Sequence, residues 1–174
     1  MDNYPINDER IHQHDVRLLA LEAEQSEEKR QLIIQSIYNQ NPIIARNSAW
    51  VMTHFSDKLI TTFQPRINEF IDLIMTTDNI SLKRLILNIV DRLTLSENNL
   101  RTDFIDFCLE HMMSLEEPPG VQTLCMKLAH KQCLFFPELQ DEFYNLLNMM
   151  EIGNYATCVK SLHKKMVKTK QTTF

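Results

Sequence analysis

An apolar pattern recurs three times along this chain at a nearly constant spacing. Each copy places five residues at positions i, i+4, i+7, i+8 and i+11, which lie on one face of an α-helix. The copies are Ile44, Ser48, Val51, Met52 and Phe55; Leu82, Ile86, Ile89, Val90 and Leu93; and Val121, Cys125, Leu128, Ala129 and Gln132. The second copy follows the first by 38 residues and the third follows the second by 39, and only Gln132 departs from the pattern. Helical pairs repeating at about 40 residues bury their apolar faces only by stacking, so this spacing predicts a continuous core between stacked pairs.

The scarcity of glycine supports a helical fold. The chain has only two glycines in 174 residues, Gly120 and Gly153, against a usual share of about 7%. Gly-rich phosphate loops, nucleophile elbows and dinucleotide-binding turns need closely spaced glycines, so the sequence excludes them. Hairpin-rich β folds also need residues with positive φ at their turns. We therefore predict an all-α protein.

Helix-capping residues and prolines divide the chain into helical pairs. Asn41-Pro42, Ser96, Pro118-Pro119 and Pro137 each mark the start of a helix, because Asn and Ser cap helices and Pro is favoured in the first turn. We predict an N-terminal segment with a capping helix over residues 1–25. A repeat domain then covers residues 26–168, with pairs at about 26–56, 64–94, 97–133 and 137–168. A basic, frayed tail over residues 169–174 follows, and the length suits a single domain.

The stretch NPIIARNSAW, residues 41–50, resembles the second-helix signature of HEAT repeats, an Asp/Asn-Pro turn followed by x-x-x-Arg-x-x-Ala. Arg46 matches the arginine of that signature and Ala49 its small core residue. The second copy keeps the arginine at Arg84, whereas Thr123 replaces it in the third copy. The resemblance covers about residues 26–167. It implies an α-α superhelix, a HEAT/armadillo-like solenoid of about four helical pairs plus an N-terminal helix.

The same block is similar to one in a small group of HEAT-like proteins known from Bacteroidetes genomes, which carry N-P-x-I-A-x-x-x-A-W-V. In HEAT proteins the second helices usually line a concave face where partners bind. The resemblance therefore implies a non-enzymatic scaffold that binds a protein or peptide along this face.

The outward positions of the three second helices form what we call the basic strip. Its residues are Arg46, Trp50 and His54; Arg84, Asn88 and Arg92; and Thr123, Lys127 and Lys131. Five of the nine are Lys or Arg and none is acidic. Residues 154–174 carry five lysines and no acid, so with a net charge of −5 the first 153 residues sum to −10. A basic strip on an acidic body predicts an acidic peptide or protein as partner.

The basic strip has a second interpretation, in which its long side chains cover a solvated helix face and pair with nearby acids such as Asp91. Trp50, the only tryptophan, has two interpretations as well. Exposed between Arg46 and His54, it would be a natural binding hot spot. Alternatively it packs beneath the N-terminal helix or against the neighbouring first helix.

Two other functions compete with peptide binding. A HEAT-like DNA glycosylase, or a simpler nucleic-acid binder, would recognise alkylated DNA in a basic channel containing Trp50, Arg46, Arg84 and Arg92. The acidic body, the short chain and the absence of Asp from the basic strip argue against it. Homodimerisation through methionine-rich helix ends is the third function, leaving the protein a monomer or a weak homodimer. The methionines are Met112, Met113, Met149 and Met150.

Catalytic, metal and cofactor sites have little support in the sequence. No Ser, Cys or Thr lies beside a convincing base, so we predict no catalytic residues. The cysteines form no C-x₂-C pair, and we expect free core thiols and no metal or cofactor. The N-terminus is unlike a signal peptide and no apolar run approaches the roughly 20 residues of a membrane span. These features predict a cytoplasmic protein. The cysteines are Cys108, Cys125, Cys133 and Cys158.

Overall fold

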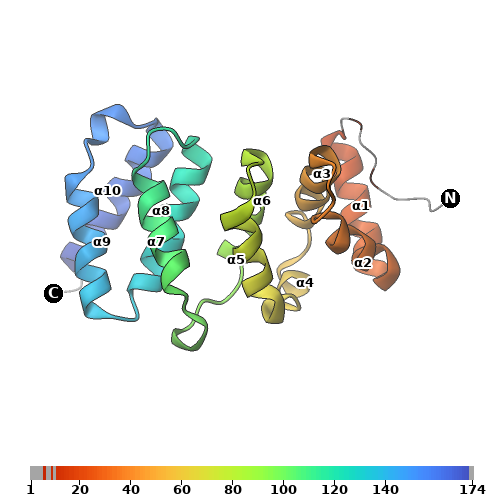
Figure 1. Ribbon diagram of the computed structural model, residues 1–174, viewed down its shortest axis with the longest axis horizontal. Coiled ribbons are helices and arrows are strands. Elements are labelled where there is room, and N and C mark those ends of the chain that lie inside the picture. The colour runs from red at the N-terminus through yellow and green to blue at the C-terminus, as the bar shows by residue number, and fades with distance from the viewer. Residues whose placement is uncertain (1–5, 7–8, 10, 173–174) are drawn as a thin grey trace. The chain divides into compact units, whose positions relative to one another are not determined.

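The computed structural model describes Ile6, Glu9 and residues 11–172, with side chains as far as Lys168 (Figure 1). Over these residues it contains ten α-helices, three short 3₁₀ helices and no strand, which confirms the all-α prediction. Contacts within the chain divide it into two compact units, residues 1–94 and residues 95–174. The sequence favoured a single domain. The boundary falls between the second and third predicted helical pairs, and each unit is described by itself.

Unit 1 contains six α-helices and one 3₁₀ helix. They are α1 (Gln13–Gln25), α2 (Glu27–Ser36), α3 (Pro42–Met52), α4 (Asp57–Thr61), η1 (Gln64–Arg66), α5 (Ile67–Thr76) and α6 (Ile80–Asp91). Helix α1 packs on α2 and α3, α2 on α3, α5 on α6, and α3 on α6. The second helices of the first two pairs, α3 and α6, are therefore direct neighbours (Figure 1).

The starts of these helices follow from their capping residues. The side-chain oxygen of Asn41 accepts a hydrogen bond from Ile43 N at 2.9 Å, and Pro42 occupies the first position of α3. Asn79 caps α6 by accepting from Leu82 N at 3.1 Å. Its amide nitrogen also donates to the Pro42 carbonyl at 3.0 Å, so the cap of one second helix is bonded to the start of the other. This bond aligns the N-terminal ends of α3 and α6.

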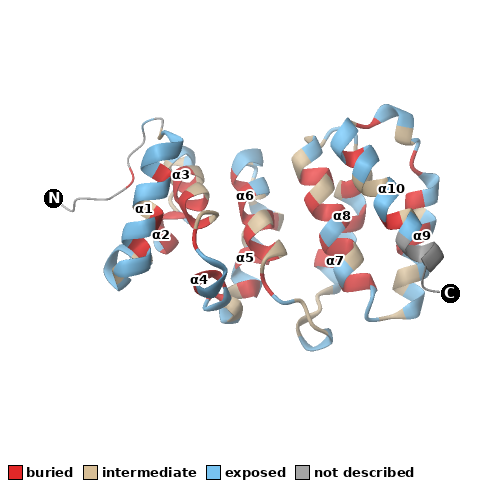
Figure 2. Ribbon diagram, turned by 180° about the vertical axis from the view of Figure 1, so that it is seen from behind, coloured by how far each residue is buried: buried red, intermediate tan, exposed pale blue. Residues whose placement is uncertain are grey.

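The repeated apolar pattern forms the core, as predicted. Fourteen of its fifteen residues are buried, and only Ile44 is partly exposed. Figure 2 shows buried segments on α3, α6 and α8. Gln132, the residue that departs from the pattern, is also buried and donates from Nε2 to the Leu128 carbonyl at 3.2 Å. Burial is therefore set by helix position, and the two polar members, Gln132 and Ser48, are satisfied by hydrogen bonds, the latter to the Ile44 carbonyl at 2.7 Å.

Ile6 and Glu9 precede helix α1, and Glu9 is hydrogen-bonded to α3. Ile6 is only 2% exposed. The buried amide of Asn47 donates from Nδ2 to the Glu9 carbonyl at 3.0 Å and accepts from Arg46 Nη2 at 2.6 Å. Asn47 thus joins Glu9 to α3. The sequence pattern gave no reason to expect a buried asparagine at this position.

Unit 2 contains η2 (Glu97–Asn99), α7 (Thr102–Met113), α8 (Pro119–Cys133), α9 (Pro137–Met149), η3 (Ile152–Asn154) and α10 (Thr157–Thr172). Helix α8 contacts α7, α9 and α10 and is the central helix of the unit. Tyr155 donates from its hydroxyl to the Met113 carbonyl at 2.6 Å, which joins the segment before α10 to the end of α7. Helix α10 continues to Thr172, into the stretch 169–174 predicted as a basic tail, and residues 173–174 lie outside the described chain.

The burial of sulfur-containing residues corrects two predictions. Met112 and Met150 belong to the core, and of the four methionines proposed for dimerisation only Met149 is strongly exposed, at 71%. A methionine-rich contact surface is therefore not present at these helix ends. All four cysteines are free thiols, but Cys158 is exposed rather than in the core. Burial raises the pKa of Cys108 and, to about 12, that of Cys133, so both thiols are protonated at neutral pH.

Candidate functional site

Helices α3 and α6 together line a half-open cavity of about 190 Å³, which we call the α3–α6 cavity. It lies wholly within unit 1. Three residues of the predicted basic strip line it, and two residues that sequence reasoning missed complete it. The lining residues are Arg46, Trp50, Ser81, Arg84 and Leu85. Ser81 lies three residues before Arg84, on the same helical face, and this spacing is the signal that could have identified it.

Arg46 lies at the centre of the site and is partly buried. Its Nη2 donates to Asn47 Oδ1 at 2.6 Å. Its Nε is fully buried and has no hydrogen-bond partner among the described residues. A buried donor without a partner costs about 1–3 kcal/mol, and more for a charged group. Because Nε has no accessible surface, an acceptor could reach it only after a shift of the Arg46 side chain.

Arg84 and Trp50 supply the other donors of the cavity. Arg84 is exposed, and its guanidinium makes no hydrogen bond or ion pair within the part of the chain that the structure describes. Trp50 is partly buried, and its indole Nε1 has no hydrogen-bond partner among those same residues. Trp50 is therefore neither fully exposed nor fully buried, and it lines the cavity.

His54 fixes the position of Trp50. The two rings meet edge to face, with centroids 6.5 Å apart and an interplanar angle of 64°. His54 Nδ1 lies 3.1 Å from the Trp50 carbonyl, to which Thr53 Oγ1 also donates at 2.7 Å. His54 itself lines a different hollow of about 240 Å³, together with Arg17, Ala20, Leu21 and Glu24. It supports Trp50 from the α1 side and does not line the α3–α6 cavity.

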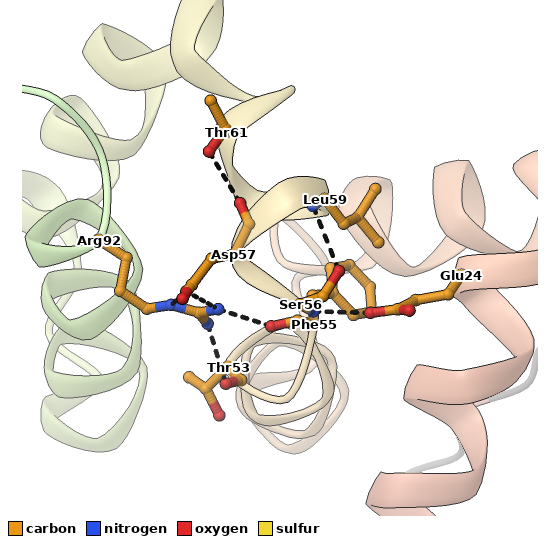
Figure 3. A network of polar contacts seen from close by, with 8 residues as sticks. All are labelled: Glu24, Thr53, Phe55, Ser56, Asp57, Leu59, Thr61 and Arg92. Carbon is orange, nitrogen blue, oxygen red and sulfur yellow. Dashed lines mark hydrogen bonds and ion pairs between the residues drawn. The ribbon is translucent and has the colours of Figure 1, made fainter.

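Arg92 was predicted to face a partner, and the structure gives it a different role (Figure 3). Its Nε and Nη2 lie 2.9 and 2.7 Å from Asp57 Oδ1. Its Nη1 and Nη2 also donate to the carbonyls of Thr53 and Phe55, at 3.1 and 2.6 Å. The guanidinium therefore binds the C-terminal end of α6 to the loop between α3 and α4. For this residue, the alternative of pairing within the repeats is correct, with Asp57 in place of Asp91.

The remaining residues of the basic strip lie outside the cavity. Asn88 is partly buried, one turn beyond Arg84 on α6. Lys127 and Lys131 are exposed on α8, and Thr123 on the same helix is partly buried. These three belong to unit 2. The candidate site of unit 1 therefore consists of Arg46, Trp50 and Arg84, with Ser81 and Leu85.

The described residues contain no group of three or more His, Cys, Asp or Glu side chains that could bind a metal ion. Nor does this part of the chain include a helix long and apolar enough to cross a membrane.

Helical pairs that repeat at a fixed spacing and bury their shared faces define the α-α superhelix class. The chain belongs to the HEAT repeat domain family, whose model matches residues 7–170. The match includes α1, which the sequence prediction had set apart as a capping segment. No curated protein and no solved structure matched the chain in the same comparisons.

Proposed function

We propose that this protein is a non-enzymatic scaffold that binds an acidic segment of another protein at the α3–α6 cavity. The observation that carries this proposal is the set of donors in one small space. Arg46, Arg84 and the Trp50 indole all face it, and neither arginine has a carboxylate partner among the described residues. Such a cavity favours a ligand rich in acceptors, and two guanidinium groups favour an anion.

The residue types around the cavity favour binding over catalysis. General acid–base chemistry needs a group such as His, Asp or Glu that can move a proton near neutral pH. The five lining residues include none of these. Ser81 could act as a nucleophile only beside a base, and a guanidinium group does not serve as a general base. The arrangement therefore supports recognition of an anionic group and gives no means of transforming it.

Trp and Arg are the residues most often found at binding hot spots. Here they project from two packed α-helices, so little conformational entropy is lost when a ligand orders them. The hydrogen bond from the Asn79 side chain, which caps α6, to the Pro42 carbonyl of α3 contributes to that rigidity, as does the contact of His54 with Trp50. A preformed site suits a short segment of a partner better than a large flat surface.

Selection of peptides from a random display library against the whole protein tests this function. We expect enrichment of peptides rich in Asp and Glu, and at least tenfold weaker binding of these peptides to Arg84→Glu. The matched control is Lys58→Glu, the same charge change at an exposed position in the first turn of α4. An acid is favourable at that position, so the control should fold normally.

Three outcomes would contradict the proposal. One is selection of peptides that bind Arg84→Glu as well as the unchanged protein. A second is equal loss of binding in Lys58→Glu, which would indicate a general charge effect. The third is salt-dependent binding of labelled duplex DNA with affinity above that of any peptide, which would favour the nucleic-acid alternative.

A further inference from the structure

Resting on the proposed function, we infer the local sequence that the site recognises: an acidic side chain in the α3–α6 cavity next to an apolar side chain over Pro42 and Ile43. Two adjoining hollows of unit 1, which share Arg46 as a wall, carry this inference. One hollow is the α3–α6 cavity. The other lies at the N-terminal ends of α3 and α6, and we call it the N-terminal hollow.

The size of the α3–α6 cavity restricts its occupant. Its volume of about 190 Å³ is below the 300–1,000 Å³ typical of cofactor and drug-like sites. It corresponds to about six water molecules at roughly 30 Å³ each. That space accommodates the carboxylate and methylene groups of one Glu or Asp. The carboxylate would lie between Arg46 and Arg84, with the methylenes against Leu85.

The buried Nε of Arg46 provides the most specific feature of this cavity. It is an N–H donor with no acceptor among the described residues. Its guanidinium is also restricted by the Nη2 bond to Asn47 Oδ1. Because Nε has no surface open to the cavity, a ligand carboxylate would accept from the Nη groups of Arg46, or from Nε only after a shift of the side chain. An uncharged amide at the same position would offer a single, weaker acceptor.

The N-terminal hollow adds an exposed aliphatic side chain, Ile43, beside Arg46. It measures about 510 Å³ and is lined by Pro42, Ile43, Arg46 and Asn79. The Asn79 side chain is already engaged, because Nδ2 donates to Pro42 O and Oδ1 accepts from Leu82 N. Ile43 N is likewise bonded to the Asn41 side chain. The lining as a whole is about equally polar and apolar, and the Ile43 side chain, which is 41% exposed, supplies apolar surface for a ligand.

Because Arg46 lines both hollows, the two ligand side chains must lie close together along the ligand. The guanidinium would bind the acidic group on one side, and its methylene stem would help cover the apolar group on the other. Successive or near-successive residues of an extended peptide meet this requirement. The partner segment would therefore contain an Asp or Glu beside a large aliphatic residue.

The experiment uses Trp50 as an internal reporter. Because it is the only tryptophan, its indole N–H gives one isolated peak in a ¹H–¹⁵N correlation spectrum of the whole protein. The probes are acetyl-Leu-Glu-amide and acetyl-Glu-Leu-amide, titrated to millimolar concentration at constant ionic strength. We expect saturable movement of the Trp50 peak with at least one of them. The Leu-Gln and Gln-Leu analogues should bind at least about tenfold more weakly, since they lack the charge.

Two variants test the two hollows one at a time. Arg84→Gln should weaken the Glu-containing probes about tenfold and leave the Gln analogues unchanged. Ile43 lies at an exposed position in the first turn of α3. Ile43→Ser should reduce the difference in affinity between acetyl-Leu-Glu-amide and a further probe, acetyl-Ser-Glu-amide. Lys58→Gln serves as the matched control and should change neither the affinity of the Glu-containing probes nor the preference for Leu over Ser.

The failure of this inference can be distinguished from failure of the proposed function. Equal binding of the Glu and Gln probes, or no dependence on Ile43, would overturn the recognition sequence. If library peptides still bound the unchanged protein and bound Arg84→Glu more weakly, the proposed function would stand and only the recognition sequence would be overturned. Tighter binding of inorganic phosphate than of the Glu probes at the Trp50 peak would overturn the carboxylate assignment in favour of a phosphorylated segment. The absence of any Trp50 shift, with no library peptide selected, would overturn both proposals.

Discussion

Arg92 Nη2 lies 2.7 Å from Asp57 Oδ1, and the same guanidinium donates to two backbone carbonyls of the loop that follows α3. Glu24 of α1 accepts from Ser56 N in that loop at 2.6 Å, so three parts of unit 1 meet there (Figure 3). The loop is therefore bonded to α6 on one side and to α1 on the other. We regard this network as the polar contact that sets the relative positions of α1, α3 and α6.

Replacing Arg92 by Ala should lower the free energy of unfolding by about 2 kcal/mol, because hydrogen bonds of a charged group to two carbonyls are lost. Urea unfolding followed by circular dichroism measures the change. Arg84→Ala is the matched control, and its effect should stay within about 0.5 kcal/mol since that side chain is exposed and unpaired in the described chain. Equal effects of the two substitutions would contradict the structural role of Arg92.

The Asp57 carboxylate should contribute less than the carbonyls do. Its side chain is 90% exposed, and ion pairs open to solvent stabilise proteins little. We therefore expect Asp57→Asn to destabilise unit 1 clearly less than Arg92→Ala, by the same urea measurement. The opposite order would mean that the ion pair dominates the network.

Asn79 offers a test of the contact between the two second helices. Asn79→Asp keeps the oxygen that caps α6 but removes the donor to the Pro42 carbonyl, whereas Asn79→Ala removes both. We expect the alanine variant to lose about 1 kcal/mol or more and the aspartate variant to lose less. Both should weaken probe binding at the Trp50 peak. Unchanged binding in both variants would show that this contact does not shape the cavity.

The thiols of the native protein should react very unequally. Cys158 is exposed, whereas Cys108, Cys125 and Cys133 are buried, and burial raises the pKa of Cys133 to about 12. Iodoacetamide at pH 8 should therefore modify one thiol per folded chain, as counted by intact mass spectrometry. Cys158→Ser should remove that reaction and full denaturation should expose the rest. Rapid native labelling of two or more thiols would contradict the described packing.

His130 should make stability depend on pH. Burial lowers the pKa of His130 below its ordinary value of 6.5, so the unfolded chain takes up its proton at a higher pH than the folded one. Stability from this group is therefore present above pH 6.5 and is lost as the pH falls through 6.5 toward the folded pKa. Between pH 7.5 and 5.5 the unchanged protein should lose more stability in urea unfolding than His130→Gln. Subtracting the pH-dependent change in stability of His130→Gln from that of the unchanged protein removes the contributions of groups that titrate in both proteins.

The sequence predicted those parts of the fold that depend on helical periodicity. The apolar repeat identified α3, α6 and α8 because burial on one helix face leaves a signal every three or four residues, and fourteen of the fifteen marked positions are buried. The short helix α4 was missed, since five residues are too few to show a period. The division at residue 94 was missed as well, because it depends on the distribution of contacts.

The candidate site was predicted only in part. Arg46, Trp50 and Arg84 do share a cavity, since equivalent positions of neighbouring repeats lie side by side. Arg92 shares the same pattern, yet its side chain turns to Asp57, a residue 35 positions away in the sequence. The choice between a solvent-facing and a loop-binding arginine depends on that loop's conformation. Helical spacing contains no information about it.

A charge-swap cycle on one selected acidic peptide tests the central claim most directly. Its affinity is measured for the unchanged protein and for Arg84→Glu, each with the original peptide and with a peptide whose key acid is replaced by Lys. If that acid lies against Arg84, each single change should weaken binding at least tenfold. The combination should recover a substantial part of the loss, because opposite charges again face each other. Losses that simply add in the doubly changed pair would contradict binding of the acidic segment at the α3–α6 cavity.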